Sequence, residues 1–200
     1  MIEQARFLAQ SFSPEWYTLR EAGVTATAAA KAATPAGMRE LMHEAEHGRE
    51  EQPDNAFMKF GRDYEAQIVA DLSSFGIAHN DWLISADTGA GAWKMATPDG
   101  LNLSHDVIAE VKTTGKDWGD WAHVPIQYRR QVQWQLHVTG AESCVFAWLL
   151  RRQLDSGELV AAWLDPKIVI VHPDPDMIED LVQTAQILQQ HKINLDEWSN

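Results

Sequence analysis

Apolar residues recur along this chain at spacings that predict both helices and strands. A four-residue repeat predicts one helix, with Gly76 as its C-cap, through the side chains Phe60, Tyr64, Ile68 and Leu72. Pro125 near the start and Gly140 at the end frame a second helix over 125–139, and a closing amphipathic helix is predicted over 174–191. Strands are predicted at 81–86, 92–97, 106–112, 143–151, 158–164 and 167–172.

The order of these elements predicts an α/β fold. Residues 1–50 favour helix, and the predicted strands alternate with helices further along the chain. We therefore expect a mixed central sheet flanked by helices. A chain of 200 residues with 45% apolar content is long enough to bury the core of one domain.

Composition narrows the classes of protein that remain. The chain has no apolar run long enough to span a membrane, and its start lacks the basic and apolar regions of a secretion signal. The single cysteine, Cys144, sits in an apolar run that predicts a buried strand, and it cannot form an internal disulfide or a four-cysteine iron–sulfur cluster. These features favour a reducing, cytoplasmic location without membrane attachment.

Most of the candidate metal-binding and catalytic residues lie between residues 97 and 112. Asp99 is followed after about ten residues by Glu110-Val111-Lys112, at the end of an apolar strand. Strand alternation places Glu110 and Lys112 on one face with Ile108. Two carboxylates and a carbonyl offer hard oxygen ligands for Mg²⁺ or Mn²⁺. A surface ion pair between the two charged strand residues is the alternative.

Polar residues on the neighbouring helices extend this pattern. Glu65 lies beside the apolar stripe of its helix, where it is either a solvated flank residue or a third acid that faces the site. Gln131 and Gln135 share one face of the 125–139 helix, and Tyr128 precedes Gln131 by three residues. That polar face is either solvated or placed beside a metal site or a DNA strand.

Five blocks of sequence, taken together, resemble the lambda-type phage exonucleases, also called the YqaJ-like viral recombinase family, within the PD-(D/E)xK nuclease superfamily. The first block runs from Trp16 to Thr27, and the resemblance extends to about Leu150. The other blocks are Gly61-x-x-Tyr64-Glu65, Pro98-Asp99-Gly100-Leu101, Glu110-x-Lys112 and Tyr128-x-x-Gln131-Val132-Gln133. The resemblance implies a single nuclease domain over 1–200, with a helical part at 1–55, a catalytic core at 56–172 and a C-terminal helix at 173–200.

The resemblance assigns the metal chemistry to the middle of the chain. Asp99 and Glu110 match the metal ligands, with the Val111 carbonyl as a third ligand. Lys112 matches the catalytic lysine, which orients or deprotonates a water and steadies negative charge. Glu65 matches the acid that completes the environment of a second ion through water. The implied cofactor is Mg²⁺ or Mn²⁺, as two ions.

The resemblance also assigns residues to the DNA. Gln131 matches the helix glutamine that lies against the active-site groups, and Tyr128 falls in the same block as a DNA-binding residue. Arg20 matches the arginine that captures the 5′-phosphate of a DNA end, with Thr25 and Thr27 adding donors. Thr27 departs from the family, which commonly has serine there, but it keeps the hydroxyl.

The implied activity is 5′→3′ digestion of double-stranded DNA from 5′-phosphorylated ends, in partnership with a single-strand annealing protein and as a homotrimeric ring. A nuclease of other polarity, a structure-specific endonuclease and an inactive DNA-binding scaffold are the alternatives. The net charge of −13 contrasts with the basic character of most nucleic-acid binders. Basic groups would then be confined to local candidates, which are Lys94, Lys112 with Lys116, Arg129-Arg130 and Arg151-Arg152.

The sequence leaves the role of two segments undecided. The two tryptophans of the loop after Lys112, Trp118 and Trp121, either stack on bases or pack against the sheet. Residues 35–55 match no motif and form an arch, a loop or an oligomer contact.

Overall fold

The computed structural model of the protein describes residues 2–49, 53–89 and 92–198. Its α-helices are α1 (Pro14–Ala22), α2 (Ala26–Ala32), α3 (Pro35–His47), α4 (Ala56–Asp71), α5 (Ile126–Thr139) and α6 (Pro175–Trp198). Its strands are β1 (Phe7–Gln10), β2 (Ile77–His79), β3 (Trp82–Ser85), β4 (Met95–Ala96), β5 (Gly100–Asn102), β6 (Val107–Thr114), β7 (Ser143–Gln153), β8 (Leu159–Ala161) and β9 (Lys167–Val171). Short 3-10 helices include η2 (Leu72–Phe75).

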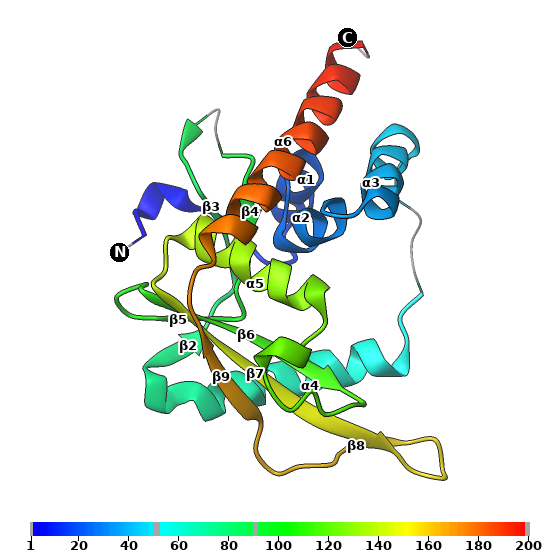
Figure 1. Ribbon diagram of the computed structural model, residues 1–200, viewed down its shortest axis with the longest axis vertical. Helices are drawn as coiled ribbons and strands as arrows, with labels where there is room; N and C mark the ends of the chain where they lie inside the picture. The colour runs from blue at the N-terminus through cyan, green and yellow to red at the C-terminus, as the bar shows by residue number, and fades with distance from the viewer. Residues whose placement is uncertain (1, 50–52, 90–91, 199–200) are drawn as a thin grey trace.

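A mixed sheet forms the centre of the molecule (Figure 1). Its strand order is β2-β5-β6-β7-β8, and β9 pairs with the first half of β7. Among the described strands of this sheet, only β6 and β7 pair in parallel, because α5 carries the chain from the end of one back to the start of the other. The expected mixed central sheet flanked by helices is confirmed.

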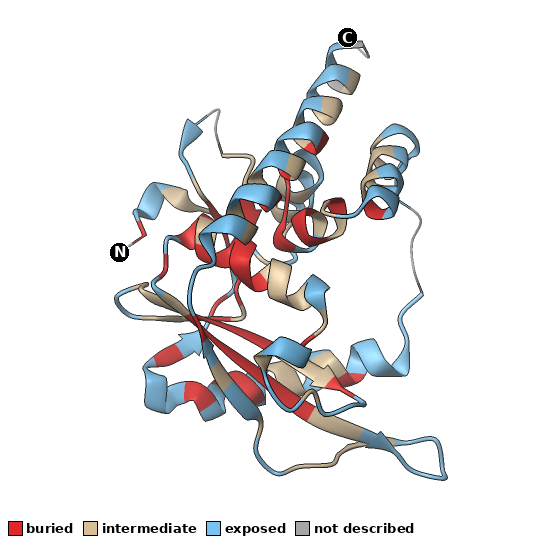
Figure 2. Ribbon diagram, in the orientation of Figure 1, coloured by how far each residue is buried: buried red, intermediate tan, exposed pale blue. Residues whose placement is uncertain are grey.

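The two faces of this sheet are buried by different helices. Ala109 and Val111 of β6 pack on the side of Ile68 and Leu72, which belong to α4 and η2. Ile108 packs on the other side in one cluster with residues of α5 and β7, namely Val132, Leu136, Cys144, Phe146 and Trp148. Figure 2 shows β6 and β7 buried along most of their length. The alternation of side chains along β6 is therefore as the sequence predicted.

A second, smaller sheet lies beside the helical layer. It has the order β1-β3-β4, and α2, α5 and α6 pack near it around Trp134 and Val138. The chain just before α2 is joined to β4 by hydrogen bonds from Val24 N–H to the Trp93 carbonyl, 2.7 Å, and from Met95 N–H to the Val24 carbonyl, 2.9 Å. The N-terminal segment is thus fixed to the strand that leads into Asp99.

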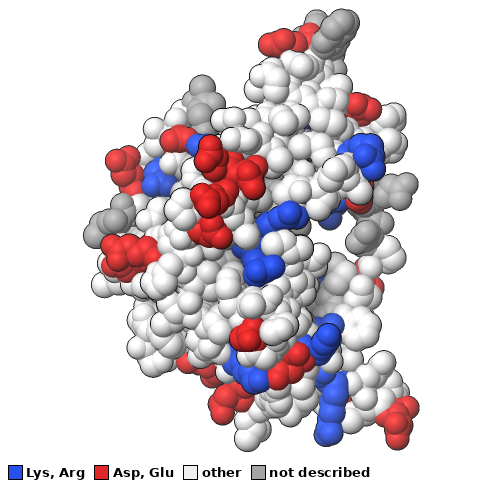
Figure 3. Space-filling model, in the orientation of Figure 1, with Lys and Arg blue, Asp and Glu red and all other residues white. Residues whose placement is uncertain are grey.

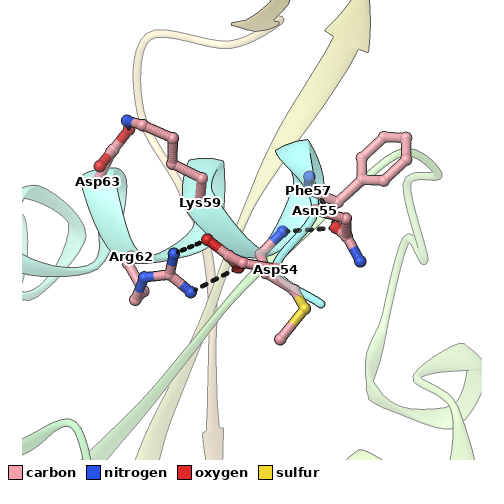
Figure 4. Close-up of polar contacts among 7 residues, drawn as sticks. Asp54, Asn55, Phe57, Lys59, Arg62 and Asp63 are labelled. Atoms are coloured by element: carbon pink, nitrogen blue, oxygen red, sulfur yellow. Dashed lines mark hydrogen bonds and ion pairs between the residues drawn. The ribbon is translucent and has the colours of Figure 1, made fainter. Parts of the chain in front are cut away.

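The start of α4 is fixed by polar contacts (Figure 4). The Asn55 side chain accepts hydrogen bonds from Phe57 N–H and Met58 N–H, each at 3.0 Å, and so caps the helix. Arg62 reaches back to Asp54 with both terminal nitrogens, and Lys59 pairs with Asp63 one turn away. These contacts fix the start of α4, the helix that carries Glu65.

Most predicted elements are present, with differences at their ends. The 92–97 strand shrinks to β4, and the strands β1, β2 and β5 fall outside the predicted set. Gly76, expected to cap the first helix, instead ends η2, with the left-handed φ of 70° that glycine adopts without strain. The closing helix runs to Trp198, beyond the predicted end at residue 191. No helix among the described residues is both long and apolar enough to cross a membrane.

Candidate active site

Glu110 and Lys112 lie on the face of β6 that α5 covers. Glu110 is 1% exposed, and the Lys112 ammonium pairs with its Oε1. An ionised carboxylate at this depth needs donors to replace water. The surface ion pair, which was the alternative interpretation of this strand, is excluded by this burial.

Helix α5 supplies those donors. Gln131 Nε2 donates to Glu110 Oε1 at 2.5 Å, and Gln135 Nε2 donates to Oε2 at 2.7 Å. The two glutamines are one turn apart, so a single helix face contacts both oxygens of the carboxylate. The polar face of this helix is therefore directed at the strand and not at solvent.

Asp99 approaches the same strand from its edge. The N–H of Asp99 donates to the Ala109 carbonyl at 3.0 Å, and Val111 N–H donates to Asp99 Oδ2 at 2.7 Å. Because the N–H and C=O of one strand residue point to the same edge, the Val111 carbonyl also faces the Asp99 side. The two predicted carboxylates and the predicted carbonyl thus converge on one stretch of β6.

Two neighbours determine where Asp99 sits. Asn80, which is 7% exposed, donates from Nδ2 to the Pro98 carbonyl at 2.9 Å, and its N–H donates to the Asp99 carbonyl at 3.1 Å. A Cβ at Gly100 would lie 2.6 Å from Ile77 Cγ2, so only glycine allows β2 and β5 to come this close. The glycine of the Pro98-Asp99-Gly100 block is therefore required by the backbone next to the acid.

The electrostatics of the cluster are those of a cation site. Burial raises the pKa of Asp99 well above its usual range, and the Glu110 and Glu65 carboxylates raise it further, against the opposing effect of Lys112. Burial acts to lower the pKa of Lys112, but the Glu110 and Asp99 carboxylates outweigh it and raise that pKa above its ordinary value. In the metal-free protein Lys112 is therefore held as the charged ammonium.

Glu65, on α4, adds to the negative charge around Asp99. Its carboxylate is one of the charges that raise the pKa of Asp99. Glu65 Oε1 also lies 3.6 Å from Nε2 of His79, whose Nδ1 is 3.3 Å from Asp81 Oδ1. Among the described residues the ion-pair partner of Glu65 is His79, and no hydrogen bond joins Glu65 to Asp99 or Glu110.

The donor set fits a hard divalent cation. Carboxylate and carbonyl oxygens are the ligands that Mg²⁺ and Mn²⁺ prefer, and Asp99 and Glu110 repel each other without a cation between them. In the described part of the chain no three His, Cys, Asp or Glu side chains are arranged to hold one ion. The expected set therefore needs the Val111 carbonyl beside the two acids.

The residues expected at the 5′-phosphate lie in the N-terminal segment. Arg20 is half-buried on α1, with its guanidinium carbon 4.1 Å from the centre of the Trp16 ring. Burial and the nearby Arg49 lower the pKa of Arg20, and it makes no hydrogen bond or ion pair with a described residue. Its donors are thus available to a ligand.

The two threonines differ in exposure. Thr25 is buried and caps α2, since its hydroxyl accepts from Ala28 N–H at 3.4 Å. Thr27 is exposed in the first turn of the same helix. Within the described residues, no hydrogen bond joins Arg20, Thr25 or Thr27 to the carboxylate cluster. The structure brings together the metal residues but leaves this second group apart from them.

Aromatic residues line the opposite side of the cluster. The Tyr128 ring centre is 5.5 Å from Lys112 Nζ and 5.6 Å from the Trp118 ring. Trp118 also packs on Phe146 and Trp148, and Trp121 packs edge-on against Phe146 at 5.2 Å. Of the two interpretations of this loop, packing against the sheet is the one that the structure supports.

Several residues of the site escape sequence reasoning. Arg151, one of the local basic candidates and the last residue of the predicted 143–151 strand, donates to the Thr113 carbonyl and hydroxyl beside Lys112, a contact that the sequence did not predict. His79 and Asn80 lie in a short polar stretch that indicates only a turn. Gln135 carried a signal in its four-residue spacing from Gln131, but the spacing did not identify Glu110 as its partner.

Comparison with known proteins agrees with this architecture. LHK-Exo, an alkaline exonuclease from Laribacter hongkongensis, has a similar structure with a TM-score of 0.67 and 24% identity, over 93% of this chain and 95% of that chain. A phage related exonuclease from Haemophilus somnus 129PT gives 0.66 and 12%, over 89% and 96%. These likenesses confirm that the chain has the fold of these exonucleases, the expected α/β fold with a mixed central sheet. No curated protein sequence matches the chain.

A family model identifies the relationship from sequence. The model of the YqaJ-like viral recombinase domain matches residues 15–142. This range contains Arg20, the whole of β6 and the two α5 glutamines that bind Glu110. The agreement of sequence, fold and site shows that the chain belongs to the YqaJ-like viral recombinase family.

Proposed function

We propose that the protein is a divalent-metal-dependent exonuclease that digests double-stranded DNA in the 5′→3′ direction from 5′-phosphorylated ends. The observation that carries this proposal is the fully buried Glu110, placed beside Asp99 and paired with Lys112. A buried acidic pair with one ammonium is costly to keep for folding alone, but suits chemistry on a phosphodiester.

The metal would be held by Asp99, Glu110 and the Val111 carbonyl, as Mg²⁺ or Mn²⁺ and as two ions. When bound, such ions lower the pKa of a water and stabilise charge on the phosphate and on the leaving oxygen. Glu65 extends the acidic surface towards a second ion through water. The support for this set is its oxygen chemistry and the mutual repulsion of its carboxylates.

Lys112 and the α5 amides stabilise charge on the phosphate and hold the metal ligand in place. The charged ammonium of Lys112 stabilises negative charge that develops on the phosphate. Gln131 fixes Glu110 from the helix side, and Tyr128 borders the lysine. These groups are set by packing before DNA arrives, so little reorganisation is needed during the reaction.

Arg20 would recognise the terminal 5′-phosphate. Its planar guanidinium presents donors in a fixed fork that matches phosphate geometry, and no described acid competes for it. Thr27 is exposed and can add a hydroxyl, whereas the hydroxyl of Thr25 serves the cap of α2 and contributes through the backbone.

The family supports a proposal for the biological setting. A 5′→3′ exonuclease leaves 3′ single strands, which are the substrate of a single-strand annealing protein in phage-type recombination. We place the protein in the bacterial cytoplasm as a homotrimeric ring, in which the product strand stays threaded and digestion is processive.

Digestion of linear duplex DNA in Mg²⁺ tests the function. Three substrates are compared, with 5′-phosphate ends, with 5′-hydroxyl ends and as closed circles, and Asp99→Ala is the control. We expect loss of the 5′-phosphorylated strand, slower attack on hydroxyl ends and intact circles. Cleavage of circles would indicate an endonuclease, and the absence of any cleavage would indicate a DNA-binding scaffold.

A further inference from the structure

The two oxygens of Glu110 have unequal partners. Oε1 accepts from both Lys112 Nζ and Gln131 Nε2, whereas among the described residues Oε2 accepts only from Gln135 Nε2, at 2.7 Å. A carboxylate oxygen offers about two lone-pair sites. Oε1 is therefore filled by protein donors, and Oε2 is the oxygen that keeps a free lone pair for a cation.

The position of Gln135 leaves one of its own polar atoms without a partner. It is 1% exposed, and its amide oxygen is buried without a hydrogen-bond partner among the described residues. The opposite amide orientation would direct that oxygen at the Glu110 carboxylate, so the acid fixes the orientation with Nε2 inwards. A buried amide that leaves its own acceptor unpaired in order to hold a carboxylate indicates a role in the site.

The chemical type of this donor matters as much as its position. A lysine or arginine at residue 135 would neutralise Glu110 and compete with a metal ion. An amide donates a hydrogen bond without a positive charge, so Glu110 keeps the charge that attracts a divalent cation. Residues that orient a metal ligand in this way usually govern affinity for the metal.

We infer that Gln135 is a positioning residue that fixes Glu110 with its Oε2 available to the metal, and so sets the affinity of the site. This inference rests on the proposed metal-dependent function and deepens it. It assigns to α5 two separate tasks, because Gln131 shares the lysine-bound oxygen and Gln135 holds the other.

Binding of Mn²⁺ to the full chain, without DNA, tests the inference. Free Mn²⁺ is followed by electron paramagnetic resonance in wild type, Gln135→Met and Gln133→Met. Gln133 is a matched control because it is also buried on α5, at 3% exposure, but its amide binds the His172 carbonyl at 3.0 Å and Asp174 N–H at 2.7 Å. We expect about 10- to 100-fold weaker binding for Gln135→Met and a change within about twofold for Gln133→Met.

A second variant covers the case in which Gln135→Met does not fold. Gln135→Asn keeps an amide but is one methylene too short to reach Glu110, and it should also weaken Mn²⁺ binding. Equal affinity in wild type and both Gln135 variants would overturn the inference, as would an equal loss in Gln133→Met or a wild type that binds no Mn²⁺. Because the readout needs no DNA, a protein that binds Mn²⁺ but digests nothing would contradict the proposed function alone.

Discussion

At the scale of single residues, the carboxylates of Asp99 and Glu110 are held where their charges repel. Burial is the main cause of the raised pKa of Asp99, and repulsion from the Glu110 carboxylate raises it further. Folding alone would favour removing one charge, so the site keeps both acids at the expense of stability. Activity and stability should therefore respond in opposite directions to substitution here.

The substitution Asp99→Asn tests this opposition. The amide can still accept from Val111 N–H, but it brings no charge. We expect activity to fall by more than the roughly 10- to 100-fold typical of a residue that only supports a metal ligand. The metal-free protein should melt a few degrees higher, since about 1 kcal/mol corresponds to roughly 2–4 °C in a chain of this size. Full activity would remove Asp99 from the metal site.

The pH dependence of stability provides a second test of Asp99. An acid whose pKa is raised by folding stabilises the native state when protonated. That contribution is fully present below the ordinary pKa of 3.8 and is lost as the pH rises through the raised value of the folded protein. Thermal melting of the metal-free protein across this range should decline more steeply in wild type than in Asp99→Asn. Parallel curves would contradict the raised pKa.

Arg20 is the residue that we propose to set the preference for a phosphorylated end. We expect Arg20→Gln to lower the ratio of cleavage rates on 5′-phosphate and 5′-hydroxyl ends by roughly 10- to 100-fold, since hydrogen bonds between charged groups contribute about 1.5–3 kcal/mol each. Arg20→Lys should fall between, because it keeps the charge but loses the fork. Thr27→Ser serves as the control, and an unchanged ratio in Arg20→Gln would exclude this role.

At the scale of elements, the unit formed by β6 and α5 carries most of the site. Glu110 and Lys112 come from the strand, and Gln131 and Gln135 come from the helix that follows it. The parallel pairing of β6 with β7 requires this helix to cross over the sheet, which places its polar face above Glu110. The geometry of the site is thus a consequence of chain topology.

Asn80 tests how far neighbouring elements position Asp99. We expect Asn80→Ala to destabilise the protein by about 2–3 kcal/mol, since buried hydrogen bonds to Trp82 and Pro98 are lost, and to reduce activity because Asp99 is released. Urea unfolding and a cleavage assay measure the two effects. Asn102→Ala is the control, because Asn102 holds the turn before β6 and does not contact Pro98 or Asp99. Equal losses of activity would contradict a specific role for Asn80.

Sequence pattern predicted the long elements and the centre of the site. The α5 helix and the β6 strand have strong periodicity and clear ends, so their positions and faces could be predicted. The strands β2 and β5 are three residues each, too short for a periodic signal, and their close approach depends on Gly100, where a Cβ would lie 2.6 Å from Ile77 Cγ2. The partners Asn80, His79 and Arg151 depend on contacts between distant segments, which no local pattern encodes.

At the scale of the whole molecule, charge is distributed unevenly. Figure 3 shows acidic side chains gathered over the start of α6, with basic ones nearby over α5. A cavity of about 500 Å³ between these helices is lined by Arg130 together with Asp174, Asp176 and Asp180. With 29 acidic and 16 basic residues, the surface as a whole repels duplex DNA.

This charge distribution predicts weak dependence of end binding on salt. If only about three Lys or Arg side chains contact DNA phosphates, the slope of log affinity against log salt concentration should be close to −3. Fluorescence titration of 5′-phosphorylated duplex ends, in Ca²⁺ to prevent cleavage, measures the slope. A closed circle of the same sequence is the control, and we expect it to bind too weakly to detect. A slope steeper than about −6 would contradict confined basic contacts.

The hydrogen bonds that join Val24 to β4 connect two segments with different proposed tasks. The groups proposed for bond cleavage all lie between Glu65 and Gln135, whereas the arginine proposed to recognise the DNA end lies on α1, ahead of α2, which packs on α5. Evolution can therefore alter which DNA end is accepted by substitutions in the first helices, while the acids, the lysine and the amides stay unchanged. Chimaeras of two family members joined at Val24 would retain the chemistry of one parent and acquire the end preference of the other.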